Sequence, residues 1–284
     1  MYAITGITGN IGGEIARTLL AAHLPVRAIV RNPAKAQSWA DLGCEIAQAD
    51  LFDVPALTAA FTGAEAVFIL IPPVFDPSAD FAEARAAAAA LKSALTAARP
   101  SRVVYLSTIG AQAAETNLLS QHTLIENELR QLSIPITFLR PAWFMENASW
   151  DIAPARETGA IPSFLTPLDR AIPMIATADI GRLAAELLQQ PATTHQTVEL
   201  QGPEPVSPNH IAATFAELLG RPIHAEAVPR DTWEQAFRAQ GMKNPNPRIR
   251  MIDGFNQGWI TFETSSVRKG TTTLKTVLKS LLDR

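Results

Sequence analysis

The chain has 284 residues, of which 24 are basic, 27 are acidic and 47% are hydrophobic. This length allows one large domain, or a main domain with a smaller one, and the composition is that of an ordinary soluble protein. The nearly balanced charge contains no basic block, which argues against direct nucleic-acid binding. The single cysteine, Cys44, excludes an internal disulfide, and the five histidines show no metal-ligand spacing, so no metal is expected.

The beginning of the chain, Tyr2–Thr5, already has the pattern of a strand, so we expect no signal peptide. No apolar run reaches the roughly 18 residues that span a bilayer. We therefore expect a soluble, cytoplasmic protein that makes no membrane contact.

Six short apolar runs in the first 140 residues indicate strands. They are rich in Val, Ile and Phe, and several are apolar at consecutive positions, which is typical of strands buried on both faces of a parallel sheet. The runs are Tyr2–Thr5, Val26–Val30, Cys44–Gln48, Ala66–Ile71, Val103–Leu106 and Ile136–Leu139.

Segments with helical spacing separate these runs. The repeated alternation of strand and helix predicts an α/β fold with a Rossmann-type, doubly wound parallel sheet. The helices are expected over Ile11–Ala22, Pro33–Leu42, Val54–Phe61, Ala79–Ala98 and Asn117–Leu132.

After about Arg140 the pattern changes, because Pro, Gly and aromatic residues become frequent. We expect a main domain over residues 1–145, to which residues 171–190 return, and a smaller, irregular C-terminal lobe over residues 146–284. Helices are predicted over Ile180–Leu188, Pro208–Leu219 and Asp231–Gln240, and a loop over Lys243–Arg250.

Three glycines between the first strand and the first helix form a phosphate loop. Gly6 permits a tight turn, Gly9 lets the backbone approach a pyrophosphate, and Gly12 lets the helix lie close to the sheet. The helix N-terminus then presents free N–H groups and a partial positive charge to phosphates. The strand–turn–helix context makes this a dinucleotide site. Its other expected contacts are Thr8, Asn10 and Ile11.

The end of the second strand indicates which dinucleotide binds. NAD-selective domains carry an acidic residue here, but this chain has Arg31. A guanidinium pairs with a 2′-phosphate, and Lys35 can assist it, so the domain of residues 1–145 is expected to bind NADP(H). Asp50 and Leu51 follow the third strand, where such folds flank the adenine. A simple helix cap is an equal alternative for Asp50.

Further cofactor contacts are expected where later strands end, because ligands of open α/β sheets bind at that edge. Two prolines give the loop after the fourth strand a rigid, apolar wall without N–H donors. The hydroxyls that end the fifth strand can reach a nicotinamide ribose or a substrate, although Ser and Thr are also common caps. The residues concerned are Ile71, Pro72, Pro73, Ser107 and Thr108.

Taken together, these motifs resemble the NmrA-like group of atypical short-chain dehydrogenases. The group includes NADPH-dependent reductases of quinones (the quinone oxidoreductase 2 type) and of triphenylmethane and azo dyes, and also a non-catalytic redox sensor. The resemblance implies an NADP(H) cofactor, with Pro141, Ala142 and Phe144 bordering the nicotinamide. It rests on the spacing of the three glycines and on Val30–Pro33, Tyr105–Ala111, His122–Glu126, Leu139–Asn147 and Ala178–Gly181.

The chain departs from ordinary short-chain dehydrogenases at their catalytic pair. Those enzymes carry a Tyr and a Lys four residues apart, and this chain has His122 and Glu126 at that spacing. The two tyrosines of the chain are not placed for this role, and the quinone-reductase branch resembles the chain in carrying His there. Helical spacing places His122 on an inward stripe. We expect it to donate a hydrogen bond or a proton to the substrate, with Glu126 holding its imidazole and Ser107 as a third catalytic candidate. A packing histidine is an equal alternative.

Aromatic residues of the C-terminal lobe and of the loop after the fourth strand can form a pocket for a flat substrate, although aromatics commonly just fill cores. We therefore predict an NADPH-dependent oxidoreductase that passes hydride to a planar conjugated acceptor such as a quinone or a dye. The alternative is an NADP(H)-binding redox sensor that regulates a partner protein, and a homodimer is left open. The pocket residues are expected to be Phe75, Trp143, Asn147, Trp150 and Phe164.

Overall fold

Eight strands of the computed structural model, which describes residues 1–283, form one sheet in which every neighbouring pair is parallel. They are β1 (Tyr2–Thr5), β2 (Val26–Val30), β3 (Glu45–Gln48), β4 (Ala66–Ile69), β5 (Arg102–Leu106), β6 (Ile136–Pro141), β10 (Gln196–Gln201) and β12 (Arg268–Lys269).

The order of the strands is β12-β10-β6-β5-β4-β1-β2-β3. The chain runs outward from β1 to β3 and then returns to β4 on the other side of β1. This arrangement confirms the predicted doubly wound α/β sheet. Its switch point lies between β1 and β4, where Ile4 pairs with Phe68, and ligands of such sheets bind at the carboxyl ends of the strands there.

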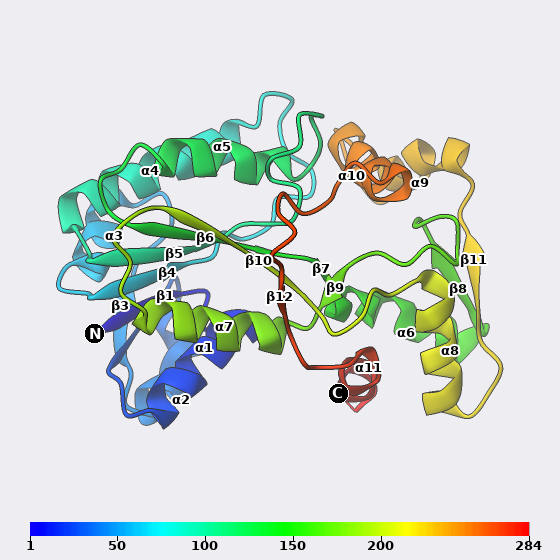
Figure 1. The fold of residues 1–284 in the computed structure, drawn as a ribbon, viewed down its shortest axis with the longest axis horizontal. Helices are drawn as coiled ribbons and strands as arrows, with labels where there is room; N and C mark the ends of the chain where they lie inside the picture. The colour runs from blue at the N-terminus through cyan, green and yellow to red at the C-terminus, as the bar shows by residue number, and fades with distance from the viewer. Residues whose placement is uncertain (284) are drawn as a thin grey trace.

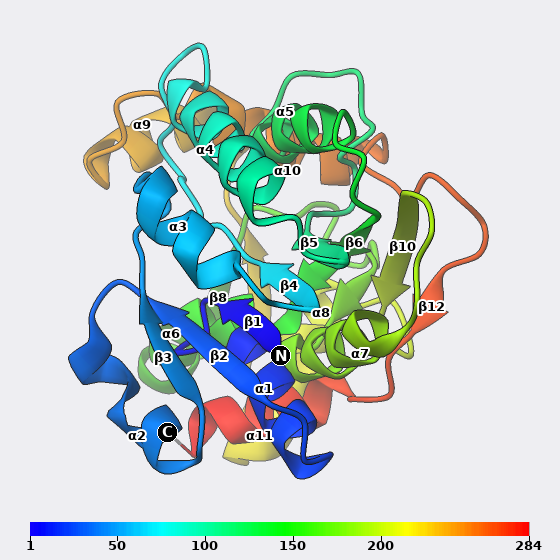
Figure 2. The same ribbon diagram turned by 90° about the vertical axis from the view of Figure 1, so that its left-hand side faces the viewer.

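Helices cover both faces of the sheet (Figures 1 and 2). In the view of Figure 2 three lie above it: α3 (Val54–Phe61), α4 (Ala82–Ala98) and α5 (Ser120–Leu129). Below it lie α1 (Asn10–Ala21), α2 (Gln37–Asp41) and α7 (Thr177–Gln189). Alternate residues of the central strands belong to two separate cores, as Ala3 packs with the helices on one face and Ile4 with those on the other. This is why the strands are apolar at consecutive positions.

Several predicted boundaries need correction. β4 ends at Ile69 and not at Ile71, because the N–H of Leu70 donates to Thr5 Oγ1 (2.8 Å) and leaves the ladder. The predicted helix Pro33–Leu42 is a 3-10 turn, η1 (Pro33–Ala36), followed by the short α2. α4 begins at Ala82 and not at Ala79, because Phe81 before it is left-handed (φ 56°).

The C-terminal part contains short elements around a third core, which includes Phe215 and Trp233. Two small sheets pair β7 (Trp143–Phe144) with β9 (Met174–Ile175) and β8 (Ala160–Ser163) with β11 (His224–Ala227). The remaining elements are η2 (Met145–Asp151), α6 (Ile152–Glu157), α8 (Pro208–Leu219), η3 (Arg230–Thr232), α9 (Trp233–Ala239), α10 (Asn246–Gln257) and α11 (Leu274–Leu282).

The predicted loop Lys243–Arg250 is wrong from Asn246 onward, where α10 begins. Pro247 lies in the first turn of this helix, where a missing N–H costs no hydrogen bond. The same proline therefore lies in the first turn of a helix where the sequence pattern predicted a loop. None of the helices in residues 1–283 has the length and apolar character needed to traverse a bilayer.

Candidate active site

The phosphate loop has the backbone geometry that its glycines predict. Gly6 is left-handed (φ 66°), a conformation that favours glycine. A Cβ on Gly12 would lie 2.3 Å from the carbonyl oxygen of Gly6, so the absence of a side chain lets α1 close onto its own loop as well as onto the sheet. Gly9 precedes α1, whose N-terminus has no capping side chain and no acidic residue in its first turn.

An uncapped helix N-terminus leaves backbone N–H groups free and keeps its partial positive charge unneutralised. Thr8, Gly9 and Asn10 are exposed, whereas Ile11 and Gly12 are buried beneath them. The loop therefore offers N–H donors at an accessible surface, and this arrangement fits a dinucleotide pyrophosphate.

Two exposed cations follow β2. Neither Arg31 nor Lys35 forms an ion pair with any group in residues 1–283 that would compete with a ligand phosphate.

Asp50 and Leu51 follow β3. Asp50 Oδ1 accepts a hydrogen bond from the N–H of Phe52 (3.0 Å), and half-buried Leu51 lies between them. The helix-cap alternative for Asp50 is wrong, because Asp53 caps α3 through the N–H of Ala56.

The imidazole of His122 is held by Tyr105. Nδ1 of His122, in the first turn of α5, lies 2.8 Å from the hydroxyl of Tyr105, near the carboxyl end of β5. Burial lowers the pKa of His122 to about 4, and the negative charge of Glu126 opposes this only in part. The ring is therefore neutral near pH 7, and its Nε2 has no hydrogen-bond partner within the described residues.

The expected contact between Glu126 and the imidazole is not formed. Both carboxylate oxygens of Glu126 are occupied by Arg140, at 2.8 and 2.7 Å, and Glu126 Oε1 also accepts from the Ser107 hydroxyl at 2.5 Å. Burial raises the pKa of Glu126, but these hydrogen bonds outweigh it and hold the pKa below its ordinary value. Glu126 and Arg140 form a buried ion pair. The Ser107 hydroxyl, which we expected to face the ligand, donates to this carboxylate instead.

The other residues expected at the cofactor lie along the same strand ends. Thr108 and Phe144 are half-buried, and Ile71 leads into the exposed prolines of the loop after β4, Pro72 and Pro73. Two buried residues lie at the end of β6. The carbonyl of Pro141, the last residue of the strand, accepts a hydrogen bond from the N–H of Ile109 (2.9 Å), and the N–H of Ala142 donates to the carbonyl of Leu200 in β10 (2.8 Å).

The predicted aromatic residues form two groups. Phe75 (44% exposed) and Trp150 (60% exposed) meet edge to face with ring centroids 6.5 Å apart. Phe164 stacks on Phe237 of α9 at 5.0 Å, and Trp143 packs against Phe255 of α10 at 5.1 Å. Asn147 is half-buried and forms no side-chain hydrogen bond within residues 1–283.

Two residues at this site were missed by the sequence analysis. Arg248 of α10 lies near the rings of both groups. Its guanidinium carbon is 5.8 Å from the ring centroid of Phe75, 6.0 Å from that of Trp150 and 4.5 Å from that of Phe237. It fell within a predicted loop, so nothing in the pattern placed it on a helix. Tyr105 was set aside because it is not four residues from a lysine, although its position at a strand end indicated the ligand-binding edge.

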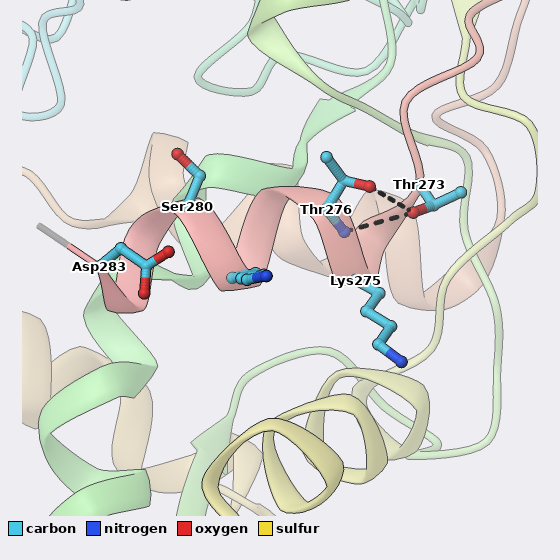
Figure 3. Close-up of a pocket in the computed structure, with 6 residues that line it drawn as sticks. Thr273, Lys275, Thr276, Ser280 and Asp283 are labelled. Atoms are coloured by element: carbon cyan, nitrogen blue, oxygen red, sulfur yellow. Dashed lines mark hydrogen bonds between the residues drawn. The ribbon is translucent and has the colours of Figure 1, made fainter.

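A surface hollow of about 430 Å³ lies elsewhere, against α11 (Figure 3). All of its lining residues belong to α11 or its immediate flanks, and none comes from the carboxyl edge of the sheet. It is therefore separate from the candidate site. The lining residues are Thr273, Lys275, Thr276, Lys279, Ser280 and Asp283.

The chain is similar in sequence and in fold to known NAD(P)H-dependent reductases. The chain is 31% identical to an NAD(P)H azoreductase of Xenophilus azovorans, over 85% of this chain and 82% of the relative. It is 27% identical to quinone oxidoreductase 2 of Escherichia coli K12, over 85% and 82%. The crystal structure of NADPH-dependent quinone oxidoreductase from Escherichia coli, complexed with NADPH, superposes with a TM-score of 0.83 at 25% identity and covers 99% of this chain and 100% of that one.

The family model described as the NmrA-like family matches residues 2–252. The resemblance inferred from the motifs is thereby confirmed, and this chain belongs to the NmrA-like family.

Proposed function

We propose that this protein is an NADPH-dependent reductase that passes hydride directly to a planar conjugated acceptor, such as a quinone or an azo or triphenylmethane dye. The similarity to an azoreductase and to a quinone oxidoreductase supports this assignment. The observation that carries it is the placement of a neutral His122, held by Tyr105, at the same sheet edge as the uncapped phosphate loop.

The cofactor is held by the main domain. The free N–H groups of α1 bind the pyrophosphate, and Arg31 with Lys35 binds the 2′-phosphate. When bound, NADPH supplies the hydride. β1 and β5 flank β4, and two strand spacings of about 4.8 Å place their carboxyl ends about 10 Å apart. The carboxyl end of β5 would therefore lie within reach of the far half of a dinucleotide whose phosphates the loop after β1 would hold.

His122 acts as a hydrogen-bond donor in this proposal and not as a proton source. The Tyr105 hydroxyl is fully buried and has no other acceptor in residues 1–283, so it donates to Nδ1 and the ring proton sits on Nε2. A neutral imidazole N–H stabilises negative charge on an acceptor oxygen or nitrogen as hydride arrives. With a quinone or an azo dye that charge is delocalised over the conjugated product, which then takes a proton from water, whereas a cationic triphenylmethane dye is neutralised by the hydride and takes up no proton. Such acceptors need no Tyr–Lys pair, and the protein contributes mainly positioning.

The test follows NADPH oxidation at the nicotinamide absorbance against a panel of quinones and azo dyes. We expect turnover, and we expect His122→Ala to lower kcat about 100-fold while the NADPH Kd stays within about twofold. His224→Ala is the matched control, because His224 lies exposed on β11 and pairs only with Glu226.

Tight NADPH binding without turnover on any acceptor would overturn the reductase and favour the redox sensor. Turnover that His122→Ala leaves unchanged would remove His122 from the mechanism and return it to packing.

A further inference from the structure

Arg248 carries a charge with aromatic rings beside it, including that of Phe237, but with no carboxylate partner. The residue is half-buried, yet no carboxylate in residues 1–283 forms an ion pair with its guanidinium. Its one polar contact is the Met242 sulfur, 3.8 Å from Nη1, and sulfur is a weak acceptor. The neighbouring arginines of this region are paired, Arg230 with Asp253 and Arg250 with Glu115. Partial burial makes a cation without an anionic partner less stable than one in water, so an anion bound beside Arg248 would be favourable.

The surroundings make this position still less favourable for a cation. Arg248 lies in the first turn of α10, which contains no acidic residue, so the guanidinium sits at the positive end of the helix. Burial lowers the pKa of Arg248 without removing its charge. Asp151, beside Trp150 in the chain, forms no ion pair with Arg248, because burial alone, with no contribution from a nearby cation, raises the pKa of its carboxyl to about 7.

Hydrogen bonds fix the start of α10 to the candidate site. The N–H groups of Lys243 and Asn244 donate to Asp76, one residue after Phe75, at 2.9 and 2.7 Å. The carbonyl of Pro247 accepts from the N–H of Leu118, in the segment that leads into α5. Figure 1 shows α10 on the side of the N-terminal end of α5.

The helix that carries His122 is joined to the same loop. Gln121, next to His122 in α5, donates from its side-chain amide to the carbonyl of Val74 (3.0 Å), one residue before Phe75. The loop after β4 therefore contacts both α5 and the start of α10. A planar molecule that reaches His122 and lies along the exposed rings of Phe75 and Trp150 comes within reach of Arg248.

We propose that Arg248 is a specificity-determining residue that binds an oxyanion substituent, a sulfonate, carboxylate or phosphate group, on the planar acceptor. The inference rests on the proposed function, because the acceptor carries the group. Phe75 and Trp150 hold the aromatic plane, and the guanidinium supplies two parallel N–H donors, a geometry that matches oxyanions. The anion also neutralises the unfavourable charge at the N-terminus of α10.

Binding is tested first without cofactor and without turnover. Calorimetric titration compares anthraquinone-2-sulfonate with the neutral 2-(hydroxymethyl)anthraquinone. We expect the sulfonate to bind about tenfold more tightly to the wild-type protein, in line with one charge-assisted contact. Arg248→Met should abolish that preference and leave the neutral ligand within about twofold, while Arg248→Lys should restore part of it.

Arg250→Met is the matched control, because it removes the same charge from the same helix at a residue already paired with Glu115. A second experiment measures NADPH oxidation with 1,2-naphthoquinone-4-sulfonate and with 1,2-naphthoquinone. Arg248→Met should raise KM about tenfold for the sulfonate alone.

The outcomes separate this inference from the proposed function. Arg248-dependent binding of the sulfonate without turnover would overturn the reductase and leave the anion site standing. Equal KM values of the wild-type protein for both naphthoquinones would overturn the anion site and leave the reductase standing. An equal loss of affinity for both anthraquinones in Arg248→Met would have the same meaning.

Discussion

The hydroxyl group of Tyr105 lies 2.8 Å from Nδ1 of His122 and determines which nitrogen of that ring carries the proton. Burial, together with the charge of Glu126, raises the pKa of Tyr105 well above its ordinary value. The phenol therefore stays protonated, and because it is fully buried with no other acceptor in residues 1–283, we infer that it donates to Nδ1 and that the N–H of the neutral ring lies on Nε2. Tyr105 is thus a positioning residue, which acts through His122.

Tyr105→Phe removes one hydroxyl and leaves Nδ1 without its donor. We expect kcat to fall about tenfold, in line with the loss of one hydrogen bond, with the NADPH Kd unchanged. Nitrogen NMR of the His122 ring should show a larger share of the Nδ1–H tautomer. Tyr2→Phe is the control, since Tyr2 is also buried but lies in β1. An unchanged tautomer ratio with a lower kcat would contradict the positioning role.

The choice between NADPH and NADH is expected to depend on Arg31. Arg31→Ala should weaken NADPH binding about 10- to 100-fold, the effect of losing charge-assisted hydrogen bonds, and leave NADH within about twofold. Calorimetric titration of both cofactors measures this. Lys35→Ala should show a smaller loss in the same direction. Equal weakening of both cofactors would remove Arg31 from the 2′-phosphate site.

Two titrating groups should tilt the pH dependence of stability in opposite directions. The pKa of His122 falls from 6.5 to about 4 on folding, so the unfolded chain binds more protons and stability rises from pH 4 to 6.5. The pKa of Asp151 rises from 3.8 to about 7, so the folded protein binds more protons and stability falls over nearly the same range.

Urea denaturation at pH 5 and pH 6.5 checks both effects against the wild-type protein. The stability lost in His122→Gln should be larger at pH 6.5 than at pH 5. For Asp151→Asn the wild-type protein should lose stability relative to the variant as the pH rises. Each difference should change by up to about 1.4 kcal/mol per pH unit. Differences that do not vary with pH would contradict the burial of these groups.

Two adjacent glycines of α1 should respond differently to a methyl group. A Cβ on Gly12 would lie 2.3 Å from Gly6 O, which is backbone and cannot move aside, so Gly12→Ala should cost about 2 kcal/mol or more and abolish cofactor binding. A Cβ on Gly13 would lie 3.2 Å from Ile7 O, and helix propensity favours Ala there, so Gly13→Ala should stay within about 1 kcal/mol. Chemical denaturation compares the pair, and a similar cost for both would contradict the close approach.

Local sequence pattern was sufficient for the phosphate loop and for the first six strands of the sheet, but it missed β10 and β12, which the sequence analysis assigned to the C-terminal lobe. Runs such as Ala66–Ile69 are apolar at every position because two helical layers cover the sheet, and this leaves a readable signature. The phosphate loop is contiguous, and it places strand, turn and helix within the first residues of the chain. The boundaries failed where a side chain or a strained residue intervened, as Thr5 does at the end of β4 and Phe81 before α4.

The candidate site beyond the cofactor loop could be predicted only as a set of residue types. Helical spacing placed Glu126 one turn from His122, but spacing does not show which side chain forms the hydrogen bonds with a buried carboxylate. Arg140 takes it, because a guanidinium forms two parallel, charge-assisted hydrogen bonds at once. Only the packing of α5 against the ends of β5 and β6 reveals that competition.

The sequence by itself determined the fold class, the phosphate loop and the strand ends that face the ligand, because each depends on neighbours in the chain or on a regular period. The tertiary structure alone decided that Tyr105 orients His122 and that Arg248 lies among Phe75, Trp150 and Phe237. These contacts join segments far apart in the sequence. The burial that shifts a pKa, or leaves a charge without a partner, exists only after those segments have packed together.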